Sequence, residues 1–134
     1  MRVMLDTNII ISIVIFNSKT LKDMLTEVCK NHQLVLCSYI IDELNEVIEK
    51  KFPTKQEILD SFLLKIPYEL EYTPKNIPDI KEIEMRDAKD KPILYSAIIA
   101  NVDIFITGDK DFDDVDILKP EVMSAVAFLD RHGE

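Results

Sequence analysis

Two aspartates stand close together near the end of this chain, directly after an apolar run. In the segment DIFITGDKDF, residues 103–112, the run Ile104–Ile106 precedes Asp109 and Asp111. The run predicts a strand, so both carboxylates would lie at its tip. Neighbouring carboxylates repel each other, and the pair therefore costs stability unless a cation lies between them. The segment thus indicates an acidic site that holds a cation.

A third aspartate occupies an equivalent place at the start of the chain. Residues Arg2–Leu5 predict a short strand that ends at Asp6. In an open parallel sheet, sites form at the carboxyl ends of the strands. Asp6 could also simply cap the helix that follows, since aspartate is a common N-cap residue. If both strands belong to one parallel sheet, Asp6 and Asp109 lie at the same edge.

The helix predicted for SYIIDELNEVIEKK, residues 38–51, places one carboxylate beside its apolar face. The apolar stripe consists of Ile40, Ile41, Leu44, Val47 and Ile48. At about 100° per residue, the acids Asp42, Glu46 and Glu49 fall on the opposite, solvent-facing side. Glu43 lies next to the stripe, so it is the acid of this helix that we expect to face inward. Taken alone, a carboxylate exposed at the rim is the simpler interpretation of Glu43.

A fourth acidic position begins an apolar helix in the segment MRDAKDKPILYSAIIAN, residues 85–101. Pro92 suits the first turn of that helix, which puts Asp90 at its start and Asp87 in the loop before it. Asp90 could merely cap the helix. We prefer Asp90 to Asp87 as the site residue because of its spacing to the helix, and the residues alone leave the choice open.

Strands and helices alternate along the chain. Strands are expected at Arg2–Leu5, Leu34–Cys37, Tyr68–Tyr72, Ile104–Thr107 and around Val115–Leu118. Helices are expected after a Ser18 cap, at Ser38–Lys51, from Thr54, from Pro92 to about Asn101, and from Pro120. The apolar run Ile9–Phe16 fits a buried helix or a strand equally well, and the start signal Asp6-Thr7-Asn8 favours a helix. Strands separated by helices predict a parallel sheet covered on both faces. The prediction is a single α/β domain over residues 1–134.

The charge distribution bears on the class of partner. The net charge is -9, and residues 79–116 carry eleven acidic against five basic residues. An acidic chain ordinarily argues against nucleic acid as a partner, because phosphate binding needs lysine and arginine. A divalent metal ion bound to the carboxylates would reverse the local charge, so that this acidic stretch could lie against a phosphate group.

Other features concern location. The longest apolar run, Ile9–Phe16, is interrupted by Ser12 and is too short to span a membrane. The N-terminus lacks the pattern of a signal peptide. Cys29 and Cys37 form no CxxC pair. A cytoplasmic protein in a reducing compartment is the expectation.

Four acidic segments, in this order, give the chain a family resemblance. MLDTNIII, IIDEL, RDAKDKPILYSAI and FITGDKDF resemble the PIN domain nucleases, most closely those that act as toxins of toxin–antitoxin pairs. Each segment alone is weakly specific, whereas the ordered set is specific and covers nearly the whole chain. The resemblance implies a three-layer α/β/α fold with a central parallel sheet of about five strands.

The resemblance also assigns roles to residues. It implies an acidic centre formed by Asp6, Glu43, Asp90 and Asp109, with metal bound by Asp6, Asp90, Asp109 and Asp111. It implies that Asn8 and Thr107 orient the carboxylates and bound water. Carboxylate oxygens favour Mg²⁺ or Mn²⁺, either of which lowers the pKa of a bound water and stabilises charge on a phosphodiester. The implied activity is hydrolysis of RNA to products with a 5′-phosphate and a 3′-hydroxyl.

Two other classes of enzyme or signalling protein also place an aspartate after the first strand. A phosphatase of the haloacid dehalogenase type needs a second aspartate two positions after Asp6, where this chain has Asn8. A response-regulator receiver needs an acidic pair at the first strand, and LDTN supplies one acid. A non-enzymatic alternative is a PIN-like module that binds RNA or protein and acts through a partner such as an antitoxin.

The sequence suggests surfaces for these partners. RNA would be bound by lysines outside the acidic stretch, with Lys19, Lys22, Lys50, Lys51 and Lys55 as candidates. For any single one of them, ordinary solubilising charge is the simpler interpretation. Homodimers are common in the family that the chain resembles, and the apolar helix face from Leu21 to Val28 is a candidate dimer surface.

Overall fold

Five parallel strands form the centre of the molecule in the order β3-β2-β1-β4-β5. The structure is a computed structural model that describes residues 1–78, 88–113, 115 and 117–133. The strands are β1 (Arg2–Leu5), β2 (Gln33–Cys37), β3 (Tyr68–Glu71), β4 (Ile104–Ile106) and β5 (Glu121–Met123). All four pairings between neighbours are parallel, which confirms the predicted sheet.

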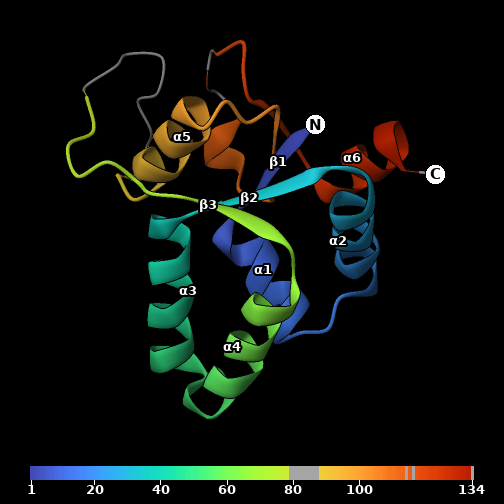
Figure 1. Cartoon of the computed structure of the whole chain (residues 1–134), viewed down its shortest axis with the longest axis vertical. Coiled ribbons are helices and arrows are strands. Elements are labelled where there is room, and N and C mark those ends of the chain that lie inside the picture. The colour runs from blue at the N-terminus through green and yellow to red at the C-terminus, as the bar shows by residue number, and fades with distance from the viewer. Residues whose placement is uncertain (79–87, 114, 116, 134) are drawn as a thin grey trace.

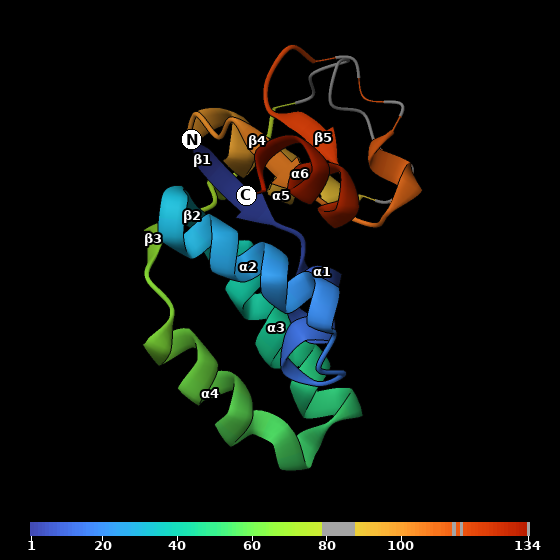
Figure 2. The same cartoon turned by 90° about the vertical axis from the view of Figure 1, so that its right-hand side faces the viewer.

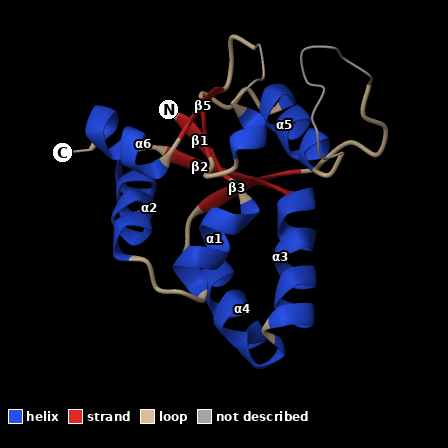
Figure 3. Ribbon diagram, turned by 180° about the vertical axis from the view of Figure 1, so that it is seen from behind, coloured by secondary structure: helices blue, strands red, loops and turns tan. Residues whose placement is uncertain are grey.

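Helices cover both faces of this sheet. They are α1 (Thr7–Val14), α2 (Lys19–Asn31), α3 (Ser38–Lys51), α4 (Gln56–Lys65), α5 (Asp90–Ile99) and α6 (Ala125–His132). Figure 1 shows α5 above the strands and α1, α3 and α4 below them, and Figure 3 shows the same layers from behind. The chain moves from β1 to β3 in one direction and then crosses back to β4, so right-handed crossovers place α5 on the opposite face. The three-layer α/β/α prediction is confirmed.

The strand order reverses between β1 and β4. β1 pairs with β2 on one side and with β4 on the other, although the chain reaches β4 only after β3. Such a switch point opens a crevice beyond the carboxyl ends of the two strands, where open α/β sheets place their sites. Val3–Leu5 of β1 and all of β4 are buried and apolar, so packing fixes the carboxyl ends of both strands.

The end of the chain differs from the sequence-based expectation. The fifth strand is Glu121–Met123 instead of Val115–Leu118, and the last helix begins at Ala125 instead of Pro120. Ser124 caps that helix, because its Oγ atom accepts a hydrogen bond from the Ala127 N–H at 3.1 Å. The apolar residues Val115, Ile117 and Leu118 suggested a strand, but the pairing with β4 begins only at Glu121, which lies opposite Ile104. Local hydrophobicity cannot indicate that register.

The apolar face of α2 is part of the core of its own protomer. Met24 and Val28 are fully buried and Leu25 is 8% exposed. Helix α2 packs against α1, β2 and α6, and Figure 2 shows α6 above one end of α2. The prediction that this face serves as a dimer surface is therefore wrong, since the face is already occupied.

Candidate metal-binding active site

Asp6 lies at the carboxyl end of β1 and is 5% exposed. It is the N-cap residue of α1, and its Oδ1 atom accepts a hydrogen bond from the Thr7 N–H at 2.8 Å. Its Oδ2 atom accepts a hydrogen bond from the hydroxyl of Thr107, also at 2.8 Å. Asp6 thus acts as a helix cap and also faces the end of β4. The capping interpretation of this residue is confirmed, and its role as a site residue remains a prediction.

The tip of β4 is held by a short series of hydrogen bonds. The Thr107 hydroxyl, which donates to Asp6, accepts a hydrogen bond from the Asp109 N–H at 2.9 Å. Oδ1 of Asp109 in turn accepts one from the Asp111 N–H at 2.9 Å. The 3₁₀ turn that follows buries Phe112 against Phe105, with ring centroids 4.9 Å apart. Backbone and core together fix where the two aspartates lie.

Asp90 meets these aspartates from the other side of the crevice. It occupies the first turn of α5 and is 9% exposed, while the N-cap position belongs to Lys89. Asp90, Asp109 and Asp111 each place one carboxylate oxygen within 4.8 Å of the other two. The structure therefore brings together three of the acids that the sequence singled out. Asp87, the competing residue, lies outside the described residues.

Glu43 faces the site, as its position beside the apolar stripe predicted. It is half-buried, whereas Asp42, Glu46 and Glu49 of the same helix are exposed. The Thr7 hydroxyl donates a hydrogen bond of 2.7 Å to Oε1 of Glu43. Because the Thr7 N–H also bonds Asp6, this single threonine joins the carboxylates of β1 and α3.

Thr7 is the site residue that sequence reasoning missed. The resemblance pointed to its neighbour Asn8, which is exposed at the start of α1. Thr107, by contrast, lies where the resemblance put it and bonds Asp6. A hydroxyl directly after Asp6 was a visible signal, but its direction depends on how α1 packs against α3. A role for Asn8 remains a prediction.

The electrostatics of the site reflect burial and crowding of negative charge. Burial raises the pKa of Asp6, the hydrogen bonds from Thr107 and Thr7 oppose that rise, and the charge of Asp109 adds to it. Burial likewise raises the pKa of Glu43, with the Thr7 hydrogen bond opposing and the Asp6 charge adding to the rise. Each acid makes ionisation of its neighbour harder, so a bound cation would relieve both costs.

The donor set suits a small hard cation. All the acids of the cluster offer oxygen, and none of them is a thiolate or an imidazole. Two oxygens bound to one Mg²⁺ at about 2.1 Å lie at most about 4.2 Å apart. The carboxylate oxygens of Asp90, Asp109 and Asp111 all lie within 4.8 Å of one another, which is compatible with a shared ion. These residues fit Mg²⁺ or Mn²⁺.

Comparisons with known proteins agree with this fold and site. A PIN domain family model matches residues 2–111, most of the chain. Ten chains of solved structures match, and one of them is from the crystal structure of VapBC2 from Rickettsia felis bound to a DNA fragment from their promoter. The match has 19% sequence identity and a TM-score of 0.73, and it covers 92% of this chain and 98% of that chain. A search of curated proteins gives no match.

An acidic crevice at the switch point of a parallel five-stranded sheet is the architecture of a PIN-type nuclease fold. The match over residues 2–111 makes the assignment specific: this chain belongs to the PIN domain family, whose members are nucleases. Within the part of the chain that the structure describes, there is no helix with the length and apolar character that crossing a membrane requires.

We predict that Glu43→Gln raises the thermal stability of the metal-free protein at neutral pH. The folded-state pKa of Glu43 lies above its ordinary value of 4.5, so its charged form destabilises the folded state as the pH rises past that value. A glutamine keeps the oxygen that accepts from Thr7 and removes the charge. We expect Tm to rise by about 2 °C and the nuclease activity to fall by about 10- to 100-fold.

Thermal melts and cleavage rates of the same preparations measure both effects. The matched control is Glu49→Gln, an exposed glutamate of the same helix, which should change neither quantity. A lower Tm for the Glu43 variant, with full activity, would contradict the inward role of this carboxylate.

Proposed function

We propose that this chain, as a single PIN-like domain over residues 1–134, is a divalent-metal-dependent endoribonuclease and the toxin of a toxin–antitoxin pair. The observation that carries the proposal is the convergence of Asp90, Asp109 and Asp111 within 4.8 Å, with Asp6 joined to Asp109 through Thr107. Family membership supports nuclease chemistry, and the oxygen-only donor set supports Mg²⁺ or Mn²⁺.

Different side chains of the site have different roles in the proposed hydrolysis. Asp90, Asp109 and Asp111, with Asp6, would hold the metal ion, which supplies a water of lowered pKa and neutralises charge on the phosphodiester. Glu43, oriented by the Thr7 hydroxyl, would position that water or accept its proton, a task that a raised pKa favours. By donating a hydrogen bond to Asp6, Thr107 favours the ionised form of that carboxyl group against the effect of burial and fixes its side chain. No serine, cysteine or histidine nucleophile is required.

Several features support the proposed partners. The similar structure from Rickettsia felis is that of a VapBC2 complex bound to promoter DNA, which supports an antitoxin as a partner here. RNA is the expected substrate, and the cytoplasm, where transcripts are translated, is the expected compartment. A homodimer remains a proposal and would need a surface other than the buried face of α2.

Cleavage of a mixed, end-labelled RNA pool tests the proposal. We expect fragments with Mn²⁺, no fragments with EDTA, and restored cleavage when metal is added back. The fragments should carry 3′-hydroxyls, so a poly(A) polymerase should extend them without phosphatase treatment. Cleavage that persists in EDTA or leaves cyclic phosphates would point to a contaminating ribonuclease. Metal-independent RNA binding without any cleavage would favour the non-enzymatic binding module.

A further inference from the structure

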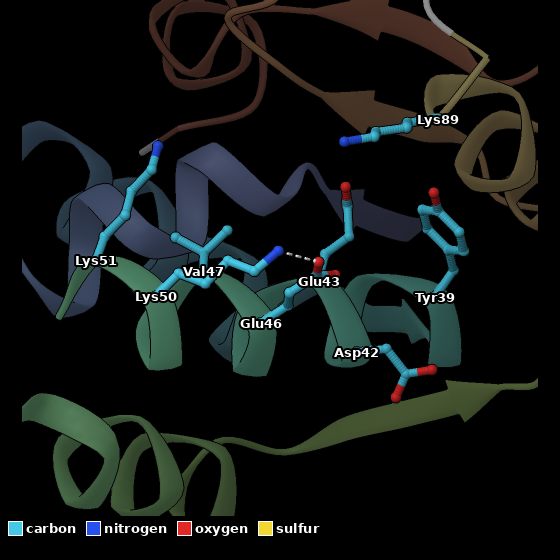
Figure 4. Close-up of a pocket in the computed structure, with 8 residues that line it drawn as sticks. All are labelled: Tyr39, Asp42, Glu43, Glu46, Val47, Lys50, Lys51 and Lys89. Atoms are coloured by element: carbon cyan, nitrogen blue, oxygen red, sulfur yellow. Dashed lines mark hydrogen bonds and ion pairs between the residues drawn. The ribbon is translucent and has the colours of Figure 1, made fainter. Parts of the chain in front are cut away.

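A polar pocket of about 380 Å³ lies beside Glu43 along one side of α3. Figure 4 shows its lining: Tyr39 stands at one end of the helix, Lys50 and Lys51 at the other, and Lys89 approaches from the start of α5. Glu43 points from the helix toward Lys89, and the Thr7 hydrogen bonds join this carboxylate to Asp6 of the acidic site. We call this pocket the α3 groove.

Three acidic side chains, Asp42, Glu43 and Glu46, and three basic ones, Lys50, Lys51 and Lys89, line the α3 groove. Next to the site, the ammonium group of Lys89 acts on Glu43 and Glu46 and favours the ionised form of both. Further along, Lys50 donates a hydrogen bond of 2.7 Å to Glu46, so these two charges neutralise each other. Lys51, exposed in the last turn of α3, follows at the far end.

The distances suit an extended polyanion. From Tyr39 to Lys51 the helix rises by about 18 Å, at about 1.5 Å per residue. That length accommodates several consecutive nucleotides, with Lys89 at the end near the acids and Lys51 at the other. The protein as a whole is acidic, with a net charge of -9, so its general field does not attract RNA. Affinity then has to come from a local path of lysines that contact phosphates.

We propose that the α3 groove binds the backbone of single-stranded RNA as it leaves the acidic site. Lys89 contacts the phosphate adjacent to the scissile one, and Lys51 contacts a phosphate further along the strand. Lys50 stays paired with Glu46, and this ion pair lines the groove between Lys89 and Lys51. This inference rests on the proposed ribonuclease function, and it assigns the substrate path that the acid cluster alone does not define.

Binding to a short single-stranded RNA tests this assignment without relying on turnover. All proteins carry Asp6→Asn to suppress cleavage, and affinity is measured by fluorescence anisotropy over a range of salt concentrations. We expect the double variant Lys51→Gln with Lys89→Gln to bind about tenfold more weakly at low salt. Its dependence of log K on log salt should be shallower by about 1.4, since each phosphate contact to a single strand contributes about 0.7.

The matched control removes two lysines that lie outside the groove. Lys30 lies in the last turn of α2 and Lys65 ends α4, and both are exposed. The double variant Lys30→Gln with Lys65→Gln has the same net charge as the test variant. It should keep the affinity within about twofold and the salt slope unchanged. Equal thermal melts of the two double variants exclude a folding defect.

The outcomes separate this inference from the proposed function. If the protein with Asp6 intact cleaves RNA with Mn²⁺, yet the test and control variants bind alike, the groove assignment is overturned and the ribonuclease proposal stands. If the intact protein neither cleaves nor binds RNA, both are overturned. A loss confined to the Lys51 and Lys89 variant, with a shallower salt slope, establishes the path.

Discussion

Asp90→Asn and Asp109→Asn should each lower the rate of Mn²⁺-dependent RNA cleavage by at least about 100-fold. Their carboxylates face one another across the crevice within 4.8 Å, together with Asp111. An asparagine has nearly the same shape but lacks the negative charge that holds a divalent ion. The folded structure should therefore remain while the metal-binding capacity falls. Single-turnover cleavage of a labelled RNA at several Mn²⁺ concentrations measures the effect.

A control variant separates site chemistry from general loss of charge. Asp113 follows the same strand tip as Asp109, but it is exposed and is not in the carboxylate cluster. Asp113→Asn should therefore retain cleavage within about twofold. Full activity of the Asp90 and Asp109 variants would show that the site is misassigned.

The same experiment decides between Asp90 and Asp87. The position of Asp90 in the first turn of α5, facing Asp109, favours a large effect for Asp90→Asn alone. Asp87→Asn should then cleave RNA at close to the normal rate. The reverse result, inactivity of the Asp87 variant with an active Asp90 variant, would transfer the role to Asp87.

Mn²⁺ should stabilise the metal-free protein strongly. A ligand that binds only the folded state adds about 2.7 kcal/mol to the free energy of unfolding at 100 times its Kd. For a chain of this length, that gain raises Tm by about 10 °C. The gain has a physical source in the crowding of Asp6, Glu43 and Asp109, whose mutual repulsion the cation relieves. Thermal melts during a Mn²⁺ titration, after treatment with EDTA, measure the shift.

The stabilisation by Mn²⁺ should grow with pH. Burial raises the folded-state pKa of Asp6 and Glu43 above their ordinary values of 3.8 and 4.5. In the metal-free protein, the free energy of unfolding therefore falls as the pH rises above these ordinary values. The reason is that the folded state holds the protons of both groups more tightly than the unfolded state does. Protons compete with the metal for the same oxygens. The gain in Tm should thus be smaller at pH 5 than at pH 7.5.

Two controls make the stability test specific. Asp109→Asn should lose most of the gain from Mn²⁺, whereas Asp113→Asn should keep it. A gain of equal size in Asp109→Asn would place the bound ion elsewhere on this acidic surface. No gain in the wild-type protein at any Mn²⁺ concentration would argue against a metal site in the crevice.

The sequence by itself determined where most of the acids lie along their elements. The apolar runs of β1 and β4 end at fixed positions, so Asp6, Asp109 and Asp111 had to lie at strand ends. The apolar stripe of α3 likewise separated Glu43 from Asp42. These inferences are reliable because hydrophobic periodicity is a property of consecutive residues, which tertiary contacts rarely override in buried segments.

The tertiary structure decided which of these positions meet. Thr7 joins Asp6 to Glu43, 36 residues further along, and only the packing of α1 against α3 brings them together. The register of β5 against β4 places the last strand at Glu121–Met123. Helix α6 packs against α2, whose apolar face is therefore buried within the protomer and does not serve as a dimer surface. The α3 groove likewise exists only because α5 carries Lys89 over α3. Such pairings depend on contacts between distant segments, whose free energy no local pattern encodes.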